Sequence, residues 1–80
     1  MKNNKFRVAI WKRLNGNENR TLIEQTDYTN QRDGMIGFKQ HIEDNQLDSK
    51  NVETDNNPVF ISRIYSPDKR ILIQILEIES

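Results

Sequence analysis

The chain has 80 residues, of which 30% are charged, and its twelve basic and twelve acidic side chains give a formal net charge of zero. We expect residues 1–80 to form a single small domain, and a balanced charge is unlike the strong net charge of nucleic-acid binders and nucleic-acid mimics. The absence of cysteine excludes disulfides, thiolate metal sites, Fe–S clusters and cysteine nucleophiles.

The first residues do not have the pattern of a signal peptide. The apolar stretch that follows Lys2 and Lys5 is short, and Arg7 and Lys12 interrupt it. No run in the chain reaches the roughly 18 apolar residues of a transmembrane helix. Because secreted domains of this size usually contain disulfides, we expect a cytoplasmic protein with no membrane partner.

Residues 5–28 have the pattern of a β-hairpin. Apolar and polar side chains alternate along residues 5–14, and three apolar residues share the inward face: Phe6, Val8 and Ile10. Asn15-Gly16 follows, a strong sequence signature of a tight hairpin turn. Residues 20–28, rich in Thr, Ile and Tyr, are expected to form the second strand.

A two-residue turn at Asn15-Gly16 fixes the register of this hairpin. On the inward face it pairs Val8 with Ile23 and Ile10 with Thr21. On the outward face it makes three favourable pairs: Arg7 with Glu24, Trp11 with Arg20, and Arg13 with Glu18. A longer loop over residues 15–19 would instead reverse the inward face of the second strand.

The next segment is expected to be an amphipathic helix. Asp33 is a suitable N-cap, and the helix would end near Leu47. Its inward face would consist of four apolar residues: Met35, Ile36, Phe38 and Ile42. A polar connection over residues 48–57 follows, with Val52 as its apolar anchor, and Pro58 prevents a helix from continuing through it.

Residues 58–80 contain two apolar runs on either side of Ser66-Pro67-Asp68-Lys69. Two structures are open for the second run. The Ser-Pro-Asp sequence would suit the start of a helix, whereas many β-branched residues favour a strand: Ile71, Ile73, Ile75 and Ile78. We favour a hairpin with its turn at Pro67-Asp68.

That turn would place three pairs on one face: Ile64 with Ile71, Ser62 with Ile73, and Phe60 with Ile75. The predicted fold class is therefore α+β in the order ββαββ, with one helix packed on a mostly antiparallel sheet made of two hairpins. The other face of the second hairpin is more apolar than a solvent-exposed face requires: Val59, Ile61, Leu72, Leu76 and Ile78. The connection around Val52, a second copy of the chain or a partner would have to cover it.

The usual catalytic constellations are missing from the sequence. His41 is the only histidine, and no serine lies in a G-x-S-x-G elbow. The three glycines lack the spacing of a phosphate-binding loop, and no second histidine or cysteine could complete a zinc site with His41. We therefore expect a protein without enzymatic activity, cofactor or metal.

The best candidate for a binding site is the outward face of the first hairpin: Arg7, Trp11, Arg13 and Arg20. Tryptophan and arginine are enriched in the hot spots of protein interfaces. An exposed aromatic ring among cations can also stack on a base while the cations hold phosphates. Alternatively, Trp11 packs within the fold and the arginines pair with Glu18 and Glu24.

These observations favour a small intracellular protein that binds a larger protein partner as an inhibitor, adaptor or regulator. A short, Asn- and Ile-rich chain without cysteine is also typical of phage and mobile-element accessory proteins. The alternative function is a nucleic-acid-binding accessory protein that uses the basic first hairpin. A homodimer is a third possibility, because nothing else staples so small a core.

Overall fold

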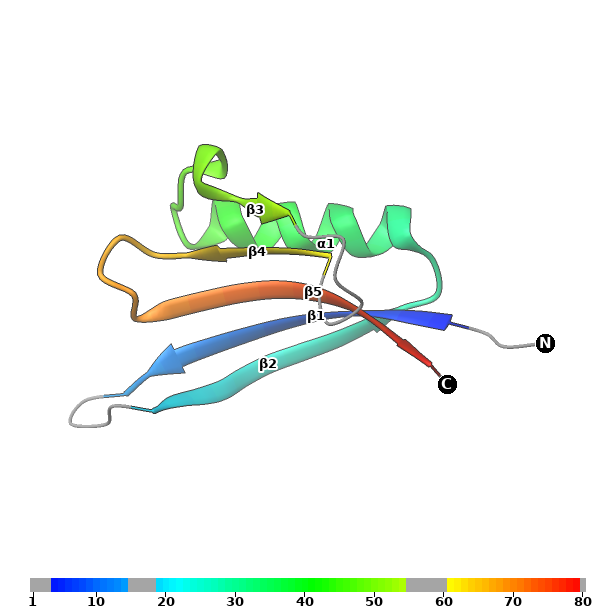
Figure 1. The fold of residues 1–80 in the computed structure, drawn as a ribbon, viewed down its shortest axis with the longest axis horizontal. Helices are drawn as coiled ribbons and strands as arrows, with labels where there is room; N and C mark the ends of the chain where they lie inside the picture. Colours follow the sequence, from blue (N-terminus) through cyan, green and yellow to red (C-terminus); the bar gives the residue numbers. More distant parts are fainter. Residues whose placement is uncertain (1–3, 15–18, 55–60, 80) are drawn as a thin grey trace.

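One α-helix lies across one face of a five-stranded antiparallel sheet (Figure 1). The structure is a computed structural model that describes residues 4–14, 19–54 and 61–79. The elements, in chain order, are β1 (Asn4–Arg13), β2 (Arg20–Tyr28), α1 (Gln31–Asp44), the 3-10 turn η1 (Ser49–Asn51), β3 (Glu53–Thr54), β4 (Ser62–Tyr65) and β5 (Ile71–Glu79). The expected α+β class is confirmed, and the two-residue β3 is an addition to the expected order.

The sheet is held together by the pairing of its two central strands. The strand order is β2-β1-β5-β4-β3, so the first strand of the chain lies beside the last. In this antiparallel pair Val8 is opposite Ile75, and Ile10 is opposite Ile73. The pairing joins the two predicted hairpins, β1–β2 and β4–β5, into one sheet.

The core lies between α1 and the strand residues that point toward it. Its buried side chains are Val8, Ile10, Phe38, Ile42, Ile64, Ile73 and Ile75. Met35 is half-buried and packs against this cluster, as expected. Ile36 was expected to point inward, which is wrong, since its side chain is 59% exposed. Successive helical residues are about 100° apart, so Ile36 lies roughly 200° around the helix from Phe38.

The helix begins earlier than the sequence suggested. Asn30, and not Asp33, is the N-cap: its Oδ1 accepts a hydrogen bond from the Asp33 amide at 2.8 Å. The Asn30 side-chain amide also donates to the Asp33 carboxylate at 3.0 Å. Asp33 is therefore the third residue of the helix, where its carboxylate interacts favourably with the positive end of the helix dipole. The helix ends at Asp44, before the expected Leu47. No helix in the described residues is long and apolar enough to cross a membrane.

The expected strand in residues 71–79 is confirmed, but its register differs by two residues. Ile64 is opposite Ile73, and Ser62 is opposite Ile75. The turn is longer than the predicted one, because Ser66 and Ile71 close it through a backbone hydrogen bond of 2.9 Å. A slip of two residues keeps every side chain on the same face, so the predicted inward side chains of β4 and β5 still point to the core. Phe60 lies outside the described residues.

The predicted register of the first hairpin is wrong in a more consequential way. Val8 is opposite Thr26, and not Ile23, while Ile10 is opposite Glu24, and not Thr21. A β-bulge between Ile10 and Trp11 shifts the pairing by one residue. Because the shift is one residue, it reverses which side chains of β2 face the helix in the part of the strand between the bulge and Tyr28. This is the reversed inward face that was expected for a longer loop. Asn15-Gly16 and Glu18 lie outside the described residues.

The turn between β4 and β5 depends on one buried hydroxyl. Ser66 is 5% exposed. Its Oγ donates to Asp68 Oδ1 at 2.6 Å and accepts from the amides of Arg70 at 3.1 Å and Ile71 at 3.0 Å. The hydrogen bond from Ser66, followed by that from the Arg70 amide, lowers the pKa of the Asp68 carboxyl. The Ser66 side chain thus fixes the length of the turn.

Replacing Ser66 by alanine (Ser66→Ala) should reduce the free energy of unfolding by about 1–3 kcal/mol, because the part-buried amide of Ile71 loses its acceptor and the carboxylate of Asp68 loses its donor. Ser49→Ala is the matched control, and an exposed substitution of this kind should change stability by less than about 0.5 kcal/mol. Urea unfolding followed by circular dichroism measures both. Equal stability of the two variants would contradict the role of the Ser66 hydroxyl.

Candidate functional site

The face of the sheet opposite α1 is not covered by any described element (Figure 1). Side chains alternate along a strand, so the residues between the core positions point to this side. We call this side the open face. Its large apolar and aromatic members are Trp11, Leu22, Tyr65, Leu72, Leu76 and Ile78.

The pairing of β1 with β5 merges two surfaces that the sequence presented separately. Trp11 lies opposite Leu72, Arg7 opposite Leu76, and Lys5 opposite Ile78. The basic hairpin face and most of the apolar face of the second hairpin are therefore one surface. Nothing in the sequence indicates which strands become neighbours, so this union could not be found from either hairpin alone.

The structure places all four residues of the basic candidate site on the open face: Arg7, Trp11, Arg13 and Arg20. Of the apolar candidate face, Leu72, Leu76 and Ile78 lie there as well. Ile61 is half-buried and packs against the core cluster, and Val59 lies outside the described residues. The two candidate sets thus contribute seven residues to this one face.

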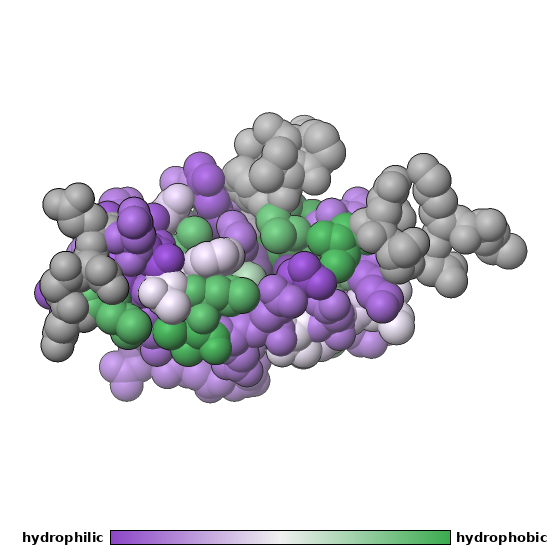
Figure 2. Space-filling model, turned by 90° about the horizontal axis from the view of Figure 1, so that it is seen from below, coloured by the Kyte–Doolittle hydropathy of each residue, from purple (hydrophilic) through white to green (hydrophobic). Residues whose placement is uncertain are grey.

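One transverse row of the open face is apolar from end to end. Cross-strand pairing aligns four side chains from four strands: Leu22, Trp11, Leu72 and Tyr65. With a strand spacing of about 4.8 Å, this Leu22–Tyr65 row spans about 14 Å. The next row is polar, since Ala9 is flanked by Gln25 and Gln74. Figure 2 shows the same alternation, with hydrophobic patches separated by hydrophilic side chains.

Trp11 and its neighbour Arg20 each have a buried N–H donor without a hydrogen-bond acceptor in the described part of the chain. The Trp11 side chain is half-buried, and its indole N–H has no hydrogen-bond acceptor among the described residues. The Nε–H of Arg20, its diagonal neighbour on β2, is buried without an acceptor as well. Buried donors in folded proteins are nearly always paired. The structure therefore concentrates two exceptions at one end of the open face.

Arg7 is paired with a carboxylate of the neighbouring strand. Its predicted partner, Glu24, is on the helix side; instead, Arg7 Nε donates to Asp27 Oδ1 at 2.8 Å and Nη2 to Oδ2 at 3.2 Å. This two-pronged hydrogen bond lowers the pKa of the Asp27 carboxyl and raises that of Arg7. The charge of Arg7 is therefore compensated within the fold by Asp27.

Tyr65 is surrounded by cations, a feature that the sequence did not suggest. The Arg20 guanidinium carbon and the Lys69 Nζ each lie 5.0 Å from the centre of its ring, and the Arg63 guanidinium carbon lies at 5.5 Å. We call Tyr65 with these three residues the Tyr65 cluster. The predicted pairing of Arg20 with Trp11 is wrong, because Arg20 lies opposite Arg13 and extends to Tyr65.

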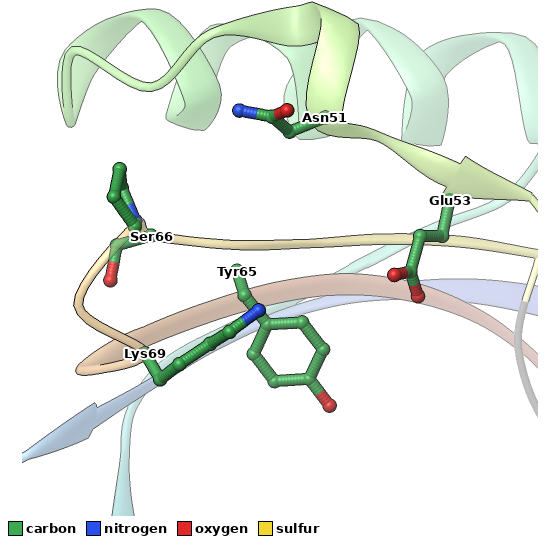
Figure 3. A pocket seen from close by; sticks show the side chains of 6 residues that line it. Asn51, Glu53, Tyr65, Ser66 and Lys69 are labelled. Atoms are coloured by element: carbon green, nitrogen blue, oxygen red, sulfur yellow. The ribbon is translucent and has the colours of Figure 1, made fainter.

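Figure 3 shows the side of the Tyr65 cluster that faces β3, where the Lys69 side chain runs alongside the Tyr65 ring. A polar cavity of about 360 Å³ lies here, lined by Asn51, Glu53, Tyr65, Ser66, Pro67 and Lys69. The Glu53 carboxylate reaches toward this space from β3 and forms an ion pair with Arg63 at 3.0 Å. Arg63 is therefore partly neutralised, in contrast to Arg20 and Lys69.

The net charge of zero conceals a basic surface. Cations on the open face come from three strands: Lys5, Arg7, Arg13, Arg20 and Arg63. Among the described strand residues that point to this side, the carboxylates are Asp27 and Glu53, which lies opposite Arg63. Acidic residues such as Asp33, Glu43 and Asp44 lie instead on α1. The open face is thus more basic than the chain as a whole.

Within the described residues, no three His, Cys, Asp or Glu side chains are grouped as metal ligands would be. Comparison of the chain with protein-family models, with curated proteins and with solved structures found no match. What the open face does must therefore be argued from its geometry and charge.

Replacing Arg7 by methionine (Arg7→Met) should raise the pKa of Asp27 toward its usual range, because the hydrogen bond from Arg7 is the main cause of its lowering. The folded-state pKa is the lower one, so the pair stabilises the fold above the unfolded-state pKa, and this stabilisation is lost as pH falls through the folded-state pKa. The stability difference between the variant and the wild type should therefore shrink in acid.

Carboxyl NMR titration and urea unfolding at neutral and acidic pH measure these two effects. Asp68 provides an internal control, because its pKa is lowered chiefly by Ser66 and should be the same in both proteins. An unchanged pKa of Asp27 in the variant would contradict the assignment.

Proposed function

We propose that the chain is a small, non-enzymatic intracellular protein that binds a larger protein partner through its open face and acts as an inhibitor, adaptor or regulator. The observation that carries this proposal is the Leu22–Tyr65 row, an apolar strip on a face that no described element covers. Contiguous exposed apolar surface bordered by polar groups is typical of interaction sites.

The composition of the row supports a protein partner. Tryptophan, tyrosine and arginine are the residue types most enriched in interface hot spots, and Trp11, Tyr65 and Arg20 lie together here. A partner that supplied acceptors to the buried Trp11 and Arg20 donors would remove an unfavourable feature of the free protein. The absence of cysteine supports a cytoplasmic setting.

The same face gives less support to a homodimer. Two open faces that meet would bring together two surfaces with the same excess of arginine and lysine, which is unfavourable. The cations and the two aromatic rings do support the alternative of a nucleic-acid-binding protein. However, the cations around Tyr65 occupy the space that a stacked base would need, and the rest of the row is aliphatic apart from Trp11.

We expect Trp11→Ala to lower recovery of the partner at least about tenfold when the tagged full chain is used for affinity capture from the cells that express it, because truncation of a hot-spot residue commonly costs more than about 1.4 kcal/mol. Leu22→Ala is a second test, since Leu22 is 40% exposed and its substitution spares the core. Far-UV circular dichroism verifies folding of each variant.

Ile36→Ala is the matched control, because Ile36 is an exposed apolar residue of α1 on the other side of the sheet. It should recover as much partner as the wild type. Equal recovery by all four proteins would remove the open face from the binding surface. Light scattering after size-exclusion chromatography tests for a homodimer. A homodimer through the open face would have twice the mass of the monomer, and Leu22→Ala would reduce this mass to that of the monomer.

A further inference from the structure

The Tyr65 cluster assembles like charges where the chain has little to neutralise them. Its cations come from β2, from β4 and from the turn before β5, and each lies within 5.5 Å of one ring centre. Arg63 has Glu53 as its partner. Neither Arg20 nor Lys69 forms an ion pair with a carboxylate of the described residues. The tyrosine ring offsets only part of the repulsion.

Arg13 extends this positive region along the edge of the Leu22–Tyr65 row. It lies directly opposite Arg20, and its backbone amide donates to the Arg70 carbonyl at 2.9 Å. Like charges directly opposite each other destabilise a pair of strands. The two carboxylates that the structure describes near these cations already have partners: Asp68 is engaged by Ser66 and Arg70, and Glu53 by Arg63.

Lys69 is held in its position by the backbone in a conformation that lysine disfavours. Its φ is 62°, in the left-handed region where glycine is the residue with least strain. Its amide donates to the Ser66 carbonyl at 2.9 Å, and its own carbonyl accepts from Arg20 Nη2 at 3.1 Å. The turn thereby fixes a cation beside Tyr65 where a glycine would be better for stability.

These positive charges border an apolar strip, which defines the chemistry of a complementary ligand. We propose, on the basis of the protein-binding function above, that the open face binds an acidic segment of the partner protein. Apolar side chains of that segment pack on the Leu22–Tyr65 row, and its carboxylates lie at Arg13, Arg20 and Lys69. Charge complementarity of this kind sets specificity and the rate of association.

An acidic protein segment fits this face better than a nucleic acid does. Aliphatic side chains, Leu22 and Leu72, flank Trp11 in the row, and they offer packing and no stacking surface. A protein segment can alternate carboxylates with apolar side chains at the scale of a strip about 14 Å long.

The test is an unbiased selection of peptides from a random display library on the immobilised full chain. We expect the selected peptides to be enriched in Asp and Glu over Lys and Arg, together with large apolar residues. Their affinity for the double variant Arg13→Glu/Lys69→Glu should be at least about tenfold lower than for the wild type, because opposite charges are replaced by like charges. Their affinity for the wild type should fall with added salt, because salt screens the attraction.

The matched control is Arg32→Glu/Lys39→Glu, which makes the same change in net charge on exposed residues of α1. The selected peptides should bind it within about twofold of the wild type, since these residues are remote from the open face and screened by solvent. Amide NMR spectra establish that both double variants are folded.

The proposal would be overturned by no selected peptide, by selected peptides without acidic enrichment, or by equal loss of affinity in both double variants. Trp11→Ala separates this failure from that of the proposed function. Peptides that lack acidic residues but are lost on Trp11→Ala would leave the open face as the binding surface, whereas peptides indifferent to Trp11→Ala would remove it. Tighter binding of a twelve-residue oligo(dT) that displaces the peptides would overturn the proposal in favour of a nucleic acid.

Discussion

The pairing of β1 with β5 is the interaction on which the rest of the structure depends. It brings the two segments that are farthest apart in the chain into register, with Val8 opposite Ile75 and Ile10 opposite Ile73. These four side chains form the centre of the core beneath α1. The same pairing aligns Trp11 with Leu72 on the opposite side, so one set of backbone hydrogen bonds determines both the core and the open face.

The open face follows from the small size of the chain. A single helix of fourteen residues can cover only one face of this sheet, and α1 lies close to it: a Cβ added to Gly34 would be 2.9 Å from Ile75 Cδ1. The outward side chains must then tolerate solvent or acquire a partner. Polar residues such as Gln25 and Gln74 are suited to solvent, whereas Trp11, Leu72 and Leu76 are not.

The elements of the fold could be predicted from the sequence, because alternation and helical spacing are local. The faces of β1, β4 and β5 were also correct, since their inward residues recur every second position and a two-residue slip does not change them. The register of β2 was predicted wrongly, because the bulge beside Trp11 has no signature in the local sequence. The Tyr65 cluster escaped prediction altogether: Arg20, Arg63 and Lys69 meet only after β1 and β5 have paired.

The unfavourable features of the fold are not distributed evenly. Arg7 has an ideal partner in Asp27, and Ser66 satisfies every amide it faces in the turn. In contrast, the like-charge pair of Arg13 and Arg20, the left-handed lysine at position 69 and the two unpaired donors all occur at the same end of the open face. A fold selected for stability alone would remove such local costs one by one with common substitutions. Such unfavourable features are expected to gather around an apolar strip if binding of a partner relieves them. The chemistry of the ligand is therefore inferred from the basic end of the open face and not from the whole face.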